Sequence, residues 1–86
     1  MANANNPHQA TDASLRQIFK AMDAHQAQEI REAYYNAVEG LRSLADALEI
    51  ADAKNPGPAS ELLIGEHLLA CQAIDVMYKS RLGRIL

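Results

Sequence analysis

The most regular pattern of apolar positions in the chain runs from Ala24 to Ala53. Apolar residues recur there in alternating steps of four and three, which is the spacing of a heptad seam along one side of a helix. Asp23, followed three residues later by Gln26, matches a capping box that begins such a helix. The pattern predicts a helix over 24–53, with a seam formed by Ile30, Tyr34, Ala37, Leu41, Leu44, Leu48 and Ala51.

A shorter apolar stripe precedes this helix. Thr11 and Asp12 are both good N-caps, and four apolar residues follow them at helical spacing. The heptad seam of the long helix, extended backwards, meets Asp23 and Lys20 instead of this stripe. We therefore expect two separate helices, with a single kinked helix as the alternative. The stripe predicts a helix over 12–22 and consists of Leu15, Ile18, Phe19 and Met22.

The segment KNPGPAS, from Lys54 to Ser60, interrupts the helical pattern. Asn and Gly tolerate positive φ, and the two prolines end one helix and fit the first turn of the next. A loop of this length, over 54–58, makes the helices on either side antiparallel. We expect a third helix over 59–83. The predicted fold class is all-α: a short N-terminal helix followed by a long antiparallel hairpin, in a three-helix, bundle-like arrangement.

The predicted third helix is apolar on most of its surface. At 100° per residue, a strip of about 80° contains Glu61, Gln72, Asp75 and Lys79, together with Gly65. One neighbouring helix cannot cover so wide an apolar surface, so we expect the first helix to cover part of it and a second copy of the chain to cover the rest. This predicts self-association, as a dimer, through Leu62, Glu66, Leu69, Ala73, Ile74, Val76, Met77 and Arg81.

Glu66 is a carboxylate near the middle of that apolar surface. One interpretation is a helix-start carboxylate that favours the helix dipole and bends toward water. The other is an ion pair across an interface, because two antiparallel copies of this helix would bring Glu66 of one copy near Arg81 or Arg84 of the other. The residues alone favour the first interpretation.

His67 and Cys71 lie four residues apart and could offer two ligands to Zn²⁺ from one helical face. A structural zinc site needs two further ligands, and the chain has no second close pair of Cys or His. We therefore expect these residues to pack, and we expect no metal and no cofactor. The chain also lacks a nucleophile elbow, a phosphate-binding glycine loop and an HExxH motif, so we expect no enzymatic activity.

The length and the charge narrow the classes of partner. Residues 1–10 offer nothing to bury, so we expect a disordered leader before one small domain over 11–86. The net charge of −3 disfavours a nucleic-acid partner. No apolar run approaches the roughly 18 residues that span a bilayer. The first residues do not resemble a signal peptide, and a lone cysteine fits a reducing compartment, so we expect a cytoplasmic protein.

Tyr35 interrupts the polar side of the helix predicted over 24–53, beside Arg31, Glu39 and Arg42. Because tyrosine is a common interface anchor, these four residues are our candidate contact patch for another protein. We expect a helical protein–protein interaction module that acts as an adaptor, a chaperone-like factor or a small inhibitor. Two alternatives remain: a DNA-binding regulator that uses the basic tail over 79–84, and a helical pocket for a small apolar ligand between the first and third helices.

Overall fold

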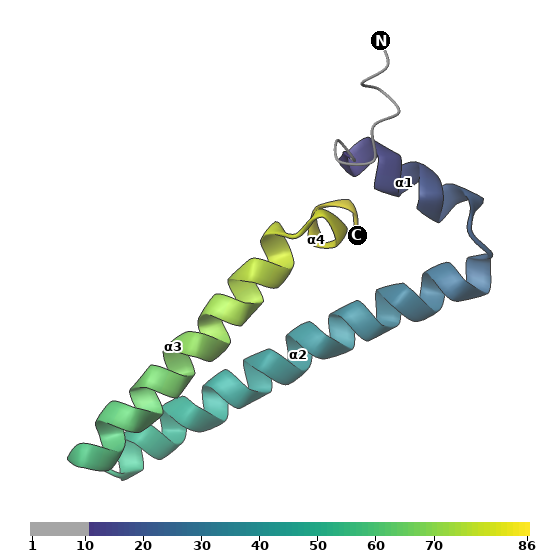
Figure 1. Ribbon diagram of the computed structural model, residues 1–86. Helices are drawn as coiled ribbons and strands as arrows, with labels where there is room; N and C mark the ends of the chain where they lie inside the picture. The colour runs from purple at the N-terminus through teal and green to yellow at the C-terminus, as the bar shows by residue number, and fades with distance from the viewer. Residues whose placement is uncertain (1–10) are drawn as a thin grey trace.

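The computed structural model describes residues 11–86, which form four helices and no strand (Figure 1). The prediction of an all-α fold is confirmed over these residues, and the leader predicted over 1–10 lies outside them. The long α2 and α3 pack against each other as the two arms of a hairpin, and the short α4 turns back to contact α1. The helices are α1 (Asp12–Ala21), α2 (Ala24–Lys54), α3 (Pro58–Lys79) and α4 (Arg81–Ile85).

The first two helices begin at side-chain caps. The Thr11 hydroxyl accepts the backbone N–H of Ser14 at 3.1 Å. The Asp23 carboxylate accepts the backbone N–H groups of His25 at 3.1 Å and Gln26 at 3.2 Å. Such caps satisfy N–H groups that have no partner inside the helix. Because α1 ends before Asp23 and α2 begins after it, the two helices are separate, as the break in the apolar pattern predicted.

The turn between α2 and α3 has the chemistry that its sequence indicates. Gly57 has a φ of 96°, a conformation that glycine adopts without steric cost, and Pro58 occupies the first turn of α3. The Asn55 amide donates to the Ala51 carbonyl at 2.8 Å, and the Ser60 hydroxyl binds the Asp52 carboxylate across the turn. These contacts hold the two arms of the hairpin together at the loop.

The helix expected over 59–83 is divided at Ser80. The Ser80 hydroxyl donates to the Met77 carbonyl at 2.6 Å and accepts the backbone N–H of Gly83 at 2.9 Å. Serine side chains compete in this way with the backbone ladder, and here the competition ends α3 and caps α4. Hydrophobic periodicity does not report this competition, because Leu82 continues the apolar pattern beyond the break.

The buried core is small and lies along the seam between α2 and α3. Only four of the described residues are buried, at 3–5% exposure: Tyr34, Val38, Ala45 and Ala70. The predicted seam of α2 contained Ala37 and Leu44, yet Val38 and Ala45 face α3 instead, and Leu44 is 49% exposed. Because α2 has apolar residues on both flanks of Tyr34, its periodicity does not show which flank packs on α3, and the contact lies on the flank of Val38 and Ala45. That part of the predicted seam was wrong.

The molecule is thin and extended. It measures 59 × 30 × 12 Å, and its smallest dimension is about the diameter of one helix. Its radius of gyration is 18.2 Å, whereas a compact domain of this length has about 12 Å. Domains are ordinarily built from two packed layers of secondary structure. The α2–α3 hairpin is a single layer, which leaves both of its faces exposed.

Candidate interaction surfaces

The layer formed by α2 and α3 has two faces, and a contact between Arg42 of α2 and Tyr78 of α3 lies on one of them. The guanidinium group of Arg42 binds the Tyr78 hydroxyl and lies 5.7 Å from the centroid of the ring. This hydrogen bond raises the pKa of Arg42 above its ordinary value. The flanks of α2 and α3 that carry these two residues therefore share a side, which we call the tyrosine face. Its other exposed residues include Tyr35, Leu68 and Cys71.

The opposite face, which we call the apolar face, carries a second seam on each helix. At 100° per residue, these seams lie on the flanks that point away from the Arg42–Tyr78 contact, and both advance in steps of four and three. The seam of α2 consists of Ala33, Ala37, Gly40, Leu44, Ala47 and Ala51. The seam of α3 consists of Leu62, Glu66, Leu69, Ala73 and Val76.

The two seams differ in size. The α3 seam projects large side chains into solvent, with Leu62 at 75%, Val76 at 66% and Leu69 at 57% exposure. The α2 seam is made of small residues apart from Leu44, and a Cβ built on Gly40 would meet nothing within 4 Å. The apolar face is therefore a ridge of Leu and Val on α3 beside a strip of mostly small residues, Ala and Gly, on α2.

The structure separates the predicted self-association residues into three groups. Five of them form the α3 seam of the apolar face. Ile74 and Met77 are half-buried and share the helical side of the buried Ala70, which places them toward α2. Arg81 lies beyond α3, in α4, and forms an ion pair with Asp12 of α1 at 3.5 Å.

Asp12 joins the first helix to the last. Its carboxylate accepts two hydrogen bonds of 2.8 Å from the Arg84 guanidinium group and also faces Arg81. The hydrogen bond from Arg84 lowers the pKa of Asp12 below its ordinary value and raises that of Arg84. Both arginines that could meet Glu66 across an interface thus have a carboxylate partner in their own chain. Glu66 itself is exposed.

His67 and Cys71 link α3 to α2. His67 Nδ1 lies 2.8 Å from the carbonyl oxygen of Ala45, and His67 Nε2 lies 3.6 Å from Cys71 Sγ. Because a carbonyl only accepts, Nδ1 carries the proton and Nε2 accepts from the thiol. His67 is therefore the contact between the arms of the hairpin, whereas Cys71 is exposed, so the expectation that Cys71 packs is wrong. No cluster of three His, Cys, Asp or Glu side chains suited to a metal ion occurs in residues 11–86.

The candidate patch for another protein lies mainly on the tyrosine face. Tyr35 is 46% exposed and meets the buried Tyr34 edge to face, with ring centroids 5.3 Å apart. The Tyr34 hydroxyl donates to the Met77 carbonyl at 3.1 Å, so Tyr35 rests on a side chain that is fixed. Arg31, which is nearer the beginning of α2, lines a pocket near α1. Sequence reasoning missed this pocket position, because it depends on how α4 folds back.

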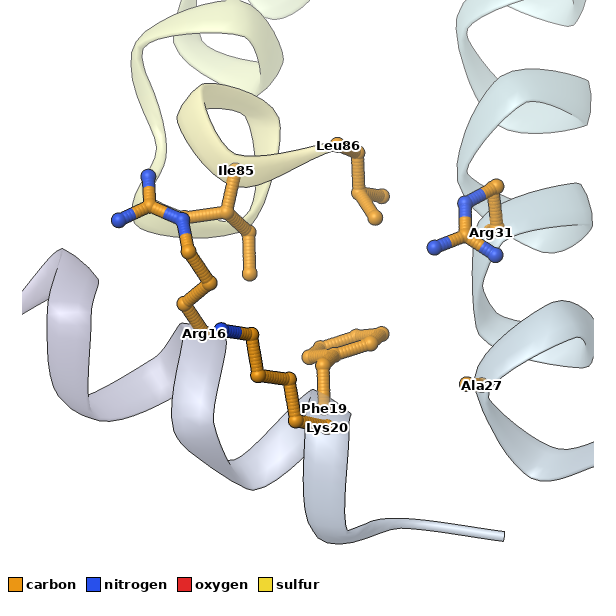
Figure 2. A pocket seen from close by; sticks show the side chains of 7 residues that line it. All are labelled: Arg16, Phe19, Lys20, Ala27, Arg31, Ile85 and Leu86. Atoms are coloured by element: carbon orange, nitrogen blue, oxygen red, sulfur yellow. The ribbon is translucent and has the colours of Figure 1, made fainter. Parts of the chain in front are cut away.

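The pocket lies between α1, the beginning of α2 and the end of α4, and measures about 210 Å³ (Figure 2). The sequence alternative placed a pocket between the first and third helices, but the third wall comes from α4. Seven residues line it: Arg16, Phe19, Lys20, Ala27, Arg31, Ile85 and Leu86.

None of the described helices is long and apolar enough to cross a membrane. Comparison with protein-family models, with curated proteins and with solved structures finds no match to this chain. Arguments about function therefore rest on the surfaces described above.

Proposed function

We propose that this chain is a protein–protein interaction module whose hairpin pairs with a second copy through the apolar face, forming a four-helix bundle. The supporting observation is the exposed ridge of Leu62, Leu69 and Val76 on a layer one helix thick. Large exposed apolar patches on soluble proteins mark interaction sites. Face-to-face pairing supplies the second layer that a helical domain ordinarily has.

The apolar face has the area that a stable dimer requires. Twenty-two residues of α3 extend for about 33 Å, and two packed helices are about 20 Å wide. The flat footprint is then about 650 Å², and a rough surface of that footprint approaches the ~800 Å² that each partner buries in a standard interface. Two copies bury enough apolar surface to compensate for the small core of each.

The difference in size between the seams favours a second copy as the partner. A twofold axis parallel to the helices places α3 of one copy antiparallel over α2 of the other. The Leu and Val ridge then packs against the strip of Ala and Gly, and the same contact repeats on the other side of the axis. Large residues facing small ones are the arrangement by which helical layers interdigitate.

In this arrangement the tyrosine face points outward on both sides of the bundle. Its patch of Tyr35, Glu39 and Arg42, with Arg31 beside it, is available to a different protein, as an adaptor or small inhibitor requires. DNA binding through the basic tail is the weaker alternative, because Arg81 and Arg84 already contact Asp12. A gel shift at low and moderate salt tests it: strong binding that falls steeply with salt would favour the DNA alternative.

Two neighbouring leucines provide a matched test of the proposed face. Leu69 on the apolar face and Leu68 on the flank of the tyrosine face are 57% and 55% exposed. We expect Leu69→Asp to abolish the dimer, because its charge enters a desolvated interface, and Leu68→Asp to leave the dimer intact. Light scattering after size-exclusion chromatography measures the mass of each variant. A dimeric Leu69→Asp variant would contradict the proposal.

A further inference from the structure

The pocket at the α1–α4 end has an apolar floor and a basic rim (Figure 2). Phe19 of α1 projects into it from one side, and Ile85 and Leu86 close it from the end of the chain. Arg31 approaches it from α2, across from Phe19. Arg16 and Lys20, one turn apart on α1, also line it, and their charged ends lie on the other side of Phe19 and Ile85 from Arg31.

The charge of the rim is not neutralised within the described part of the chain. Three of the eight Lys and Arg residues line this pocket, and no acidic residue does. Arg31 donates a hydrogen bond to the neutral Gln28 at 3.2 Å. None of Arg16, Lys20 and Arg31 forms an ion pair with a carboxylate among residues 11–86, whereas Arg81 and Arg84 both contact Asp12. In a chain with a net charge of −3, these cations favour an anionic ligand at the pocket, although Arg16 also attracts the Asp12 carboxylate and helps to lower its pKa.

We propose that this pocket binds a small carboxylic acid with a short apolar body. The carboxylate contacts Arg31, which can donate two N–H groups to it, and the apolar body lies on Phe19, Ile85 and Leu86. A volume of about 210 Å³ is below the roughly 300–1,000 Å³ of sites for drug-sized ligands. The ligand is therefore of the size of a medium-chain fatty acid.

The site is independent of the proposed dimer. Phe19, Arg31 and Ile85 belong to the α1–α4 end, and none of the lining residues belongs to the seams of the apolar face. A ligand that needs both the apolar residues and the cations of the pocket should bind more tightly than a ligand that offers only one of the two groups. A carboxylate without an apolar body cannot contact the apolar residues of the pocket. A neutral amide of the same length lacks the charge that attracts the cations.

Titration of the full chain, followed by amide NMR shifts, tests the proposal with octanoate as the probe. Acetate and octanamide are the matched ligands, and we expect each to bind at least tenfold more weakly than octanoate. The shifts should centre on Phe19, Ala27 and Ile85. Equal binding of octanamide, or octanoate shifts centred elsewhere, would overturn the proposal.

Arg31→Gln and Lys54→Gln form the matched pair of variants. Arg31 lines the pocket, whereas Lys54 is exposed at the far end of α2, so both variants lose one cation but only one loses it at the site. We expect Arg31→Gln to weaken octanoate binding about tenfold and Lys54→Gln to leave it unchanged. Unaltered circular dichroism verifies that both variants fold. Equal affinity of Arg31→Gln and the wild type, or equal weakening in both variants, would contradict the proposed site.

Discussion

The two faces of the α2–α3 layer are equally open to solvent, yet they differ in what their side chains contact. On the tyrosine face, Arg42 binds Tyr78 and Tyr35 packs edge to face on Tyr34, so its tyrosines have partners within the chain. On the apolar face, Leu62 is 75% exposed and Glu66 is the one charged member of the two seams. Exposure of a leucine alone is ordinary. Exposure of three large apolar residues at heptad spacing, beside a strip of small residues, supports the proposal that a second copy covers this face.

The prediction with the largest expected effect compares a residue on the side of α3 that packs against α2 with a residue on the apolar face. Ile74→Asp places a charge against α2 and should destabilise the hairpin by about 2–4 kcal/mol at every protein concentration. Val76→Asp, two residues away, should instead remove the rise of the melting temperature with protein concentration that a dimer shows. Thermal melts at several concentrations measure both effects. Identical behaviour of the two variants would mean that both residues lie on one surface.

A second prediction asks whether the α3–α4 corner contributes to the apolar face. A Cβ at Gly83 would lie 2.8 Å from both the Tyr34 hydroxyl and the Tyr78 carbonyl, and it would clash with the Met77 carbonyl. Gly83→Ala should weaken the docking of α4 by about 1–3 kcal/mol. Hydrogen exchange of the α4 amides measures the change.

Gly65→Ala is the control for that substitution. Gly65 is inside α3 with nothing near its built Cβ, so alanine there should stabilise the helix by up to about 1 kcal/mol. The dimer mass should be unchanged in both glycine variants. Loss of the dimer in Gly83→Ala would show that the corner, and not only the hairpin, forms the contact.

A third prediction concerns Glu66, the carboxylate on the apolar face. Burial of an unpaired carboxylate costs free energy, and both Arg81 and Arg84 already contact Asp12. Glu66→Leu should therefore tighten the dimer about tenfold, or about 1.4 kcal/mol. Glu61→Leu, in the first turn on the polar strip, should leave the affinity unchanged. A weaker dimer in Glu66→Leu would instead support an ion pair across the interface.

The smallest effect is expected from the link between α1 and α4. The Arg84 hydrogen bond lowers the pKa of Asp12 below its ordinary value of 3.8. Because the lowered pKa belongs to the folded state, the pair stabilises the protein above pH 3.8 and loses this contribution as the pH falls through the lower pKa. Asp12→Asn should lower the stability only slightly near neutral pH, since the pair is partly exposed. NMR titration of the Asp12 carboxyl measures the pKa, and a value above 3.8 would contradict the pairing.

Local signals predicted the elements of the fold better than its packing. Asp23 and Gly57 mark a helix start and a turn through their own chemistry, so these boundaries could be predicted from the sequence. The inner seam could not be assigned fully, because α2 carries apolar residues on two flanks and only the contact with α3 decides that Val38, not Ala37, is buried. Ile74 and Met77 were predicted for the self-association surface together with the α3 seam, because the sequence does not show which flank of α3 packs on α2. The pocket depends on the break at Ser80, which apolar periodicity does not show.

Sedimentation equilibrium of the full chain over a wide concentration range tests the central claim most directly. The account predicts a mass of about 19 kDa, twice that of one 9.4 kDa chain, with dissociation only on dilution. A mass of 9.4 kDa at every concentration, together with a melting temperature independent of concentration, would contradict it.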